Sequence, residues 1–133
     1  MRKKLGIAEK TLVVGHVGRF SHPKNHAFLI EIFCDIVKRR SDSKLLLVGD
    51  GILRKDIEKK CLDNPILDKV IFTGLRGDVQ DLMQAMDVFA FPSLYEGLPL
   101  VIVEAQASGL PCIISDKVPI ECKKTEGLIR QVK

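Results

Sequence analysis

Short, continuously apolar runs recur along the chain and are separated by longer segments with a helical pattern. The runs are rich in Val, Ile, Leu and Phe and lack the polar alternation of a strand with one face in water. Parallel strands covered by helices on both faces have this pattern. The sequence therefore predicts strands at Leu12–Val17, Leu45–Val48, Val70–Phe72, Val88–Phe91 and Cys112–Ile114, with a sixth at Leu128–Val132.

The segments between these runs have the 3.6-residue period of helices. In Asn25–Arg40, six apolar positions share one face: Phe28, Leu29, Ile32, Phe33, Ile36 and Val37. Further helices are predicted at Ile52–Leu62, Asp78–Met86 and Pro99–Ser108. Strands that alternate with helices favour an α/β fold: a doubly wound, Rossmann-like parallel sheet of about five to six strands with helices on both faces.

Composition narrows the class of protein. A chain of 133 residues with 46% hydrophobic and 29% charged residues fits one globular domain. No apolar run approaches the ~20 residues of a membrane span, and the basic start at Met1–Lys4 is not followed by the apolar core of a signal peptide. We therefore expect a cytoplasmic protein.

The net charge of +4 comes from short clusters such as Lys38–Arg40 near the ends of expected helices. These clusters lack interleaved aromatic residues and the chain has no Trp, so we expect no nucleic-acid partner. Four cysteines lack metal-ligand spacing and are expected to be reduced, mostly buried thiols: Cys34, Cys61, Cys112 and Cys122.

The loop after the first strand carries the charges best suited to a phosphate. In α/β sheets, ligands bind beyond the carboxyl ends of the strands. Here Gly18 lets the backbone approach a ligand, while Arg19 and Lys24 offer a guanidinium and an ammonium just before a helix N-terminus. The alternative is a pair of surface cations beside a turn. The segment is not the dinucleotide fingerprint, since Gly15-His16-Val17-Gly18 lacks the G-x-G-x-x-G spacing.

The next two loops also contain paired glycines. Gly49-Asp50-Gly51 is expected to form a tight turn in which Asp50 caps the following helix, and the spacing leaves open whether a ligand also approaches here. In Thr73–Asp78, Asp78 is expected to cap the next helix. The spacing leaves open whether Arg76 faces a ligand or solvent.

The loop after the fourth strand, Pro92–Pro99, leads into a helix that is apolar almost all round. The free amides of Leu100 and Val101 are expected to point into the cleft. A lone Glu104 in a helix buried on most sides is unexpected, because a buried carboxylate needs a partner. It either forms an internal salt bridge, extends its carboxylate to solvent, or accepts hydrogen bonds from a ligand. Glu96, eight residues earlier, is either a solvated loop carboxylate or a ligand contact.

The three histidines, His16, His22 and His26, could be read as a metal site. No carboxylate pair lies beside them at ligand spacing, so loop and capping roles are expected and no metal is predicted.

Taken in order, these motifs resemble family 4 glycosyltransferases. The run Glu96-Gly97-Leu98-Pro99, with Glu104 and Ser108-Gly109-Leu110-Pro111, resembles the E-x7-E region of that family. The other matching motifs are Gly18-Arg19, Lys24-Asn25, Val48-Gly49-Asp50-Gly51 and Phe72-Thr73-Gly74, so that the resemblance covers about Val14 to Asp116. The sequence of Pro92–Gly97 is similar to the corresponding segment of bacterial enzymes of capsule, exopolysaccharide and cell-wall polysaccharide assembly.

The resemblance implies the C-terminal, donor-binding domain of a two-domain GT-B enzyme and assigns a role to each matched residue. Arg19 and Lys24 would neutralise the diphosphate of a nucleotide sugar, and Glu96 would lie at the sugar and its departing phosphate. Glu104 would accept the ribose hydroxyls. The backbone at Gly18, Gly97 and Leu98, with the amides of Leu100 and Val101, would hold phosphate, and Gly74, Leu75 and Arg76 would meet the base. Such enzymes are usually retaining and need no bound metal.

The same resemblance predicts how the chain divides. Residues 1–10 would end an interdomain linker, and residues 11–133 would be the donor domain, shortened at its C-terminus, with the N-terminal acceptor-binding domain missing. A UDP-sugar donor, a polysaccharide or glycolipid acceptor and peripheral membrane association of the full-length enzyme are expected by analogy. The alternative is a nucleotide-binding fragment that transfers no sugar. A phospho-receiver is disfavoured, because Gly18-Arg19 stands where an acidic cluster would be needed.

Overall fold

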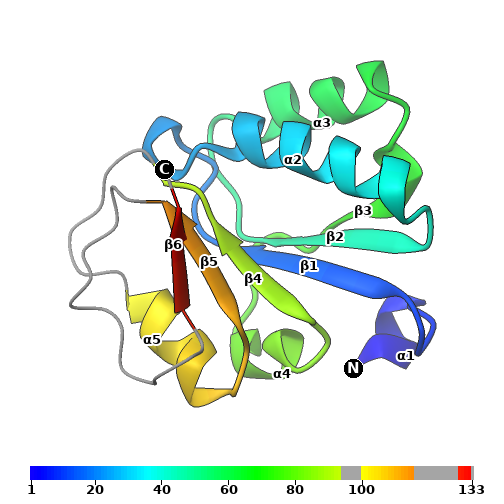
Figure 1. Ribbon diagram of the computed structural model, residues 1–133. Helices are drawn as coiled ribbons and strands as arrows, with labels where there is room; N and C mark the ends of the chain where they lie inside the picture. Colours follow the sequence, from blue (N-terminus) through cyan, green and yellow to red (C-terminus); the bar gives the residue numbers. More distant parts are fainter. Residues whose placement is uncertain (94–99, 116–128, 133) are drawn as a thin grey trace.

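The computed structural model describes residues 1–93 and 100–115 in full and residues 129–132 by their backbone. Its sheet has six strands in the order β3-β2-β1-β4-β5-β6 (Figure 1). Every neighbouring pair of strands is parallel. The strand bounds are β1 Leu12–Val17, β2 Ser43–Val48, β3 Val70–Phe72, β4 Val88–Phe91, β5 Cys112–Ser115 and β6 Ile129–Val132. The predicted doubly wound parallel sheet is therefore confirmed.

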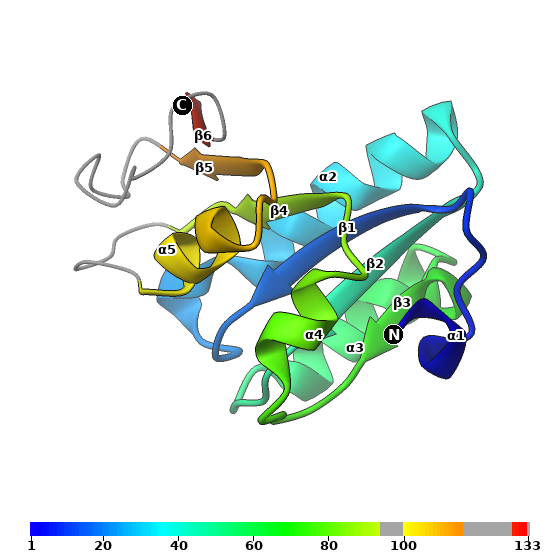
Figure 2. The ribbon, with the colours of Figure 1, turned by 90° about the horizontal axis from the view of Figure 1, so that it is seen from below.

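Helices cover both faces of the sheet, as the sequence predicted. Helices α2 (His26–Arg39) and α3 (Arg54–Asp63) lie on one face, and α4 (Val79–Met83) and α5 (Leu100–Ala107) lie on the other. Figure 2 shows the sheet from the side of α4 and α5. Short 3₁₀ turns at His22–Lys24 and Leu67–Lys69 precede α2 and β3.

Each face of the sheet has its own hydrophobic core. Val13 and Leu46 belong to the core under α4 and α5, whereas their neighbours Val14 and Leu45 belong to the core under α2 and α3. Successive residues of a strand point to opposite faces. Because both faces are apolar, both sets of positions must be apolar, which explains the continuous hydrophobic runs in the sequence.

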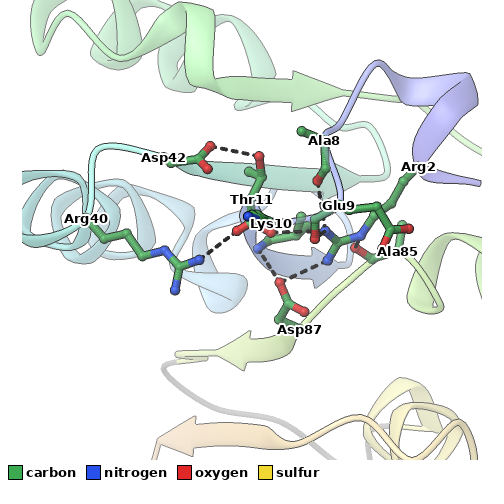
Figure 3. Close-up of polar contacts among 10 residues, drawn as sticks. Arg2, Ala8, Glu9, Lys10, Thr11, Arg40, Asp42, Ala85 and Asp87 are labelled. Carbon is green, nitrogen blue, oxygen red and sulfur yellow. Dashed lines mark hydrogen bonds and ion pairs between the residues drawn. The ribbon is translucent and has the colours of Figure 1, made fainter.

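The first ten residues fold back onto the sheet. Residues Arg2–Leu5 form a helix, α1, that sequence patterning did not predict. The Arg2 guanidinium lies 2.9 Å from the Asp87 carboxylate at the start of β4 (Figure 3). It also donates to four carbonyl oxygens, those of Ala8, Glu9, Thr11 and Ala85. A single arginine thus ties this segment to the amino-terminal edge of β1 and β4.

The prediction that Asp50 caps the helix after β2 was wrong. That helix begins at Arg54, and its N-cap is Leu53. The Asp50 carboxylate instead accepts the Gly51 N–H at 2.8 Å and lies 3.6 Å from the Arg54 guanidinium. Two intervening residues move Asp50 out of reach of the helix amides, so it stabilises the loop.

Asp78 stands at the N-cap of α4, as predicted, but its side chain makes no capping hydrogen bond. Its carboxylate accepts two bonds from Arg76, at 2.8 and 2.6 Å. The helix it precedes ends at Met83, three residues earlier than predicted.

Candidate functional site

The strand order reverses direction at β1. Chain connections run from β1 outward to β2 and β3, and then return to β4 on the other side of β1. The connections thus run to opposite sides of β1. In such sheets, ligands usually bind in a crevice beyond the carboxyl ends of the strands at this switch point.

A cavity of about 420 Å³ lies at this edge of the sheet. The loops after β1, β2 and β3 form its walls, together with the start of α4. Its lining residues are Val17, Gly18, Arg19, Val48, Gly49, Asp50, Gly51, Leu75, Arg76 and Val79. Four of the predicted site residues therefore share one cavity: Gly18, Arg19, Leu75 and Arg76. Sequence reasoning missed the apolar lining, although Val17 and Val48 end the first two predicted strands.

Backbone hydrogen bonds join the three loops around the cavity. The Gly18 N–H donates to the Val48 carbonyl at 3.0 Å, and the Gly49 N–H donates to the Gly74 carbonyl at 2.9 Å. Gly49 has a φ of 131°, and a Cβ on it would overlap the carbonyl oxygen of Gly18. A Cβ on Gly51 would lie 2.7 Å from the Phe20 carbonyl oxygen. The glycines after β2 thus serve the close approach of two loops. The predicted tight turn into the helix is also present, since the Arg54 N–H donates to the Gly51 carbonyl at 3.1 Å.

The two cations of the first loop take different positions. Arg19 is exposed and lines the cavity. Lys24 is half-buried, with its Nζ atom 5.2 Å from the centre of the Phe91 ring at the carboxyl end of β4. Two positive groups therefore flank the crevice, one beside β2 and one beside β4. Such a pair suits an anionic ligand that crosses the switch point.

The rim after β3 combines an apolar side chain with an ion pair. Leu75 is 83% exposed at the cavity, and Arg76 beside it pairs with Asp78. The hydrogen bonds from Arg76 hold the pKa of Asp78 below its usual value and raise the pKa of Arg76. Arg76 thus lines the cavity while its guanidinium is held by a carboxylate. Gly74, also predicted to meet a ligand, has a φ of 73° and is not among the lining residues.

Glu104 is exposed, so its carboxylate reaches solvent, which was one of the alternatives that the sequence left open. It shares one face of α5 with exposed Leu100 and Ala107, one turn apart, while Ile102, Ala105 and Gln106 are buried. Within the described residues Glu104 makes no ion pair, which removes the internal salt bridge as its explanation there. Instead it borders a second hollow, of about 410 Å³, opposite residues 77–81 at the start of α4.

The other predicted site residues lie at the start of α5 and just before it in the sequence. Leu100 is 67% exposed at the first turn of α5, and Val101 is half-buried against the core of that face. Glu96, Gly97 and Leu98 lie outside the described residues.

Two histidines lie in the interior, where the sequence had predicted loop and capping roles. His16 in β1 and His26 at the start of α2 are 0% and 3% exposed, and their ring centres are 4.7 Å apart. Burial is the main cause that lowers the pKa of His16 to about 4 and that of His26 to about 3, and the nearby charge of Lys24 is a smaller cause in both. Both rings are therefore neutral near pH 7. His22 alone has the exposed loop position expected of it.

In residues 1–93 and 100–115 we find no group of three His, Cys, Asp or Glu side chains arranged to hold a metal ion. Cys34, Cys61 and Cys112 are reduced cysteines, as predicted, and burial raises the pKa of Cys61 to about 11. Cys122 lies outside the described residues. Over the same part of the chain, none of the helices is long and apolar enough to cross a membrane.

Comparison with known families and proteins gives a consistent result. Residues 1–123 match the family described as glycosyl transferases group 1. The chain is 46% identical over 127 residues to the putative glycosyltransferase EpsF of Bacillus subtilis, covering 96% of this chain and 33% of that protein. It is 38% identical over 117 residues to the Escherichia coli UDP-Gal:alpha-D-GlcNAc-diphosphoundecaprenol alpha-1,3-galactosyltransferase, covering 86% of this chain and 30% of that protein.

Solved structures agree with this match. Anabaena Alr3699/HepE in complex with UDP and glucose superimposes with a TM-score of 0.87 at 28% identity, over 98% of this chain and 36% of that one. WaaG, a glycosyltransferase of lipopolysaccharide biosynthesis, gives a TM-score of 0.80 at 29% identity, over 88% of this chain and 32% of that one. The chain thus spans about a third of the length of the proteins it matches.

Proposed function

The chain belongs to the glycosyl transferases group 1 family, and from this premise we propose that it binds the nucleotide-sugar donor of a retaining glycosyltransferase. The donor is a UDP-sugar, and the acceptor is a growing polysaccharide or glycolipid. The observation that carries the proposal is the cavity at the carboxyl ends of β1 and β2, with Arg19 on its wall and Lys24 nearby on the β4 side of β1. Support for the base comes from Alr3699/HepE, whose structures hold UDP and UDP-glucose.

In this proposal the diphosphate lies between the two cations of the first loop. Arg19 donates paired hydrogen bonds to phosphate oxygens, and Lys24 supplies a point charge. The backbone of Gly18 approaches the phosphates closely because it has no side chain. As the bond between sugar and phosphate breaks, negative charge grows on the leaving diphosphate. Preorganised positive groups stabilise that charge without reorganisation, so no metal ion is invoked.

The nucleoside occupies the apolar part of the same edge. Leu75 and the backbone from Gly74 to Arg76 contact the base, and Glu104 accepts the ribose hydroxyls. Within residues 94–99, Glu96 acts at the sugar and its departing phosphate, and the amides after Gly97 hold the distal phosphate, with those of Leu100 and Val101. Transfer itself requires the remainder of a two-domain enzyme, whose other domain binds the acceptor.

Replacing Arg19 by Ala should weaken UDP binding by roughly 10- to 100-fold, because a charged hydrogen bond is worth ~1.5–3 kcal/mol. Titration calorimetry of the chain with UDP, GDP and ADP measures the loss and identifies the preferred base. Arg39→Ala is the matched control, since Arg39 is an exposed arginine at the far end of α2. Equal UDP affinity in the Arg19 variant and the wild type would remove the phosphate assignment.

Replacing Glu104 by Gln should lower UDP affinity by about tenfold, since a charged acceptor of ribose hydroxyls becomes a neutral one. Because Glu104 is exposed, the fold should be unaffected. A comparison of UDP with its 2′,3′-dideoxy analogue makes the test specific to the ribose. The wild-type chain should prefer UDP, and the variant should lose most of that preference. A preference that survives the substitution would show that another group binds the ribose.

A further inference from the structure

Four aromatic rings in contact lie between the loop that carries Arg19 and Lys24 and the carboxyl end of β4. The rings belong to Phe20, His26, His16 and Phe91, in that order. Phe20 and His26 are stacked with their centres 4.1 Å apart, and His26 meets the His16 ring edge-on at 4.7 Å. His16 in turn lies 5.3 Å from Phe91. The stack thus connects the loop after β1 with the carboxyl end of β4.

The His16 side chain joins β1 to β4 where their backbones separate. The two strands pair at Val14 with Val88 and at Gly15 with Phe89. One residue further along, the Nδ1 atom of His16 lies 2.8 Å from the carbonyl oxygen of Ala90. A carbonyl oxygen can only accept, so Nδ1 carries the hydrogen and Nε2 carries the lone pair. The imidazole therefore replaces the next backbone bond and fixes the strand spacing as the crevice opens.

The other ring nitrogen faces the phosphate-binding loop. A Cβ placed on Gly18 would lie 3.1 Å from His16 Nε2 and 3.6 Å from the Lys24 side chain. Gly18 is thus packed between the imidazole and the lysine. His16 Nε2 is buried and has no hydrogen-bond partner among residues 1–93 and 100–115. Leaving a buried polar atom unpaired costs about 1–3 kcal/mol, so a space-filling role alone gives no reason for a histidine here.

From this arrangement we propose that His16 is a positioning residue for diphosphate binding. Its Nδ1–H bond to Ala90 sets the spacing of β1 and β4, and its ring supports Gly18 and Lys24 at the height where the phosphates bind. His16 does not touch the ligand. The inference rests on the proposed function, because it gives a reason for the geometry of a loop that is itself assigned to phosphate.

Two matched variants distinguish the effect of the hydrogen bond to Ala90 from the effect of the space that the imidazole fills. In His16→Asn the amide nitrogen can occupy the place of Nδ1 and keep the bond to Ala90, whereas in His16→Gln the amide lies near the place of Nε2 and cannot. UDP and uridine affinities are measured by NMR titration of the wild-type chain and both variants. We expect His16→Gln to bind UDP about tenfold more weakly, because displaced charges lose hydrogen bonds to phosphate. His16→Asn should stay within about twofold of the wild type, and uridine affinity should be equal in all three chains.

Two further measurements keep the outcome clear. Nitrogen NMR of the wild-type chain should show His16 with the hydrogen on Nδ1, and a hydrogen on Nε2 would overturn the proposal without any ligand present. His26→Phe, which keeps the stack and loses no hydrogen bond within the described residues, should bind UDP as the wild type does. If His16→Gln does not fold, His16→Phe replaces it. That variant keeps the ring and lacks the bond, so it should bind UDP as weakly as His16→Gln. If His16→Asn does not fold, the nitrogen NMR result on the wild-type chain decides.

The possible results distinguish a failure of the proposed function from a failure of the role of His16. A wild-type chain that binds neither UDP nor uridine would remove the proposed function itself. A wild-type chain that binds UDP, with His16→Gln and His16→Asn equal to each other, would remove the role of His16 alone. The same follows if uridine and UDP affinities fall together, because that pattern indicates a general loss of structure. A selective loss of UDP binding that Asn restores supports the proposal.

Discussion

Acidification from pH 7 to pH 4 should remove on the order of 5 kcal/mol from the free energy of unfolding, most of it through His16 and His26. Burial lowers their pKa values in the folded state from 6.5 to about 4 and about 3. The unfolded chain therefore binds protons first as the pH falls. Their contribution to stability is complete above pH 6.5 and decreases toward pH 4. Since domains of this kind are stable by about 5–15 kcal/mol, acid unfolding should begin in this range.

Urea unfolding at pH 7, 6, 5 and 4.5 measures this dependence. His26→Phe should flatten the curve by removing one of the two buried bases. His22→Asn is the matched control, because the His22 ring is exposed, and it should leave the curve as in the wild type. Superimposable unfolding curves at pH 7 and pH 5 would contradict the assignment of both imidazoles to the neutral core.

Replacing Gly49 by Ala should destabilise the fold by about 3 kcal/mol and abolish measurable UDP binding. Gly49 has a φ of 131°, which residues with a Cβ rarely adopt, and the new Cβ would overlap the Gly18 carbonyl oxygen. That oxygen belongs to backbone that is itself fixed, since the Gly18 N–H is bonded to Val48 at 3.0 Å. Relief of the overlap would have to separate the loops after β1 and β2, and these two loops form the cavity wall.

Thermal and urea unfolding, followed by calorimetry with UDP, give both effects. Gly77→Ala is the matched control: a Cβ on Gly77 meets nothing within 4 Å, and its change in stability should stay within about 0.5 kcal/mol. If Gly49→Ala were as stable as Gly77→Ala and still bound UDP, close packing of the two loops would not be what holds the site together.

The sequence alone predicted the parallel sheet and most of its element bounds. Continuous apolar runs such as those at β1 and β4 have one stable arrangement, which is burial on both faces, and the helical period between them requires crossovers. Those two facts placed the loops after the strands at one edge of the sheet, and with them Gly18, Arg19, Leu75 and Arg76 at one cavity. Local patterning was enough because each of these residues lies in the loop that follows a strand, within four positions of its end.

Other features depended on contacts between residues distant in the sequence. The apolar residues of α5 indicated burial all round, but only the packing of the helix on the sheet showed that Glu104 lies on its exposed face. Asp50 was read as a helix cap because the sequence did not show that the helix begins only at Arg54, although the two residues that pair are just four positions apart. Arg2 similarly forms its bonds with Ala85 and Asp87, more than 80 positions away.

The sequence by itself determined that this protein is a doubly wound α/β domain with positive charge after its first strand, because hydrophobic period and strand-end residues are local properties. Only the tertiary structure showed which side chains pack under the loop that carries this charge. His16 and His26 are ten positions apart, and nothing in their spacing indicates that their rings meet inside the sheet edge. Both rings are buried because β1, β4 and α2 pack together around them. Burial keeps both rings neutral, and the position of His16 beside β4 allows its hydrogen bond to Ala90.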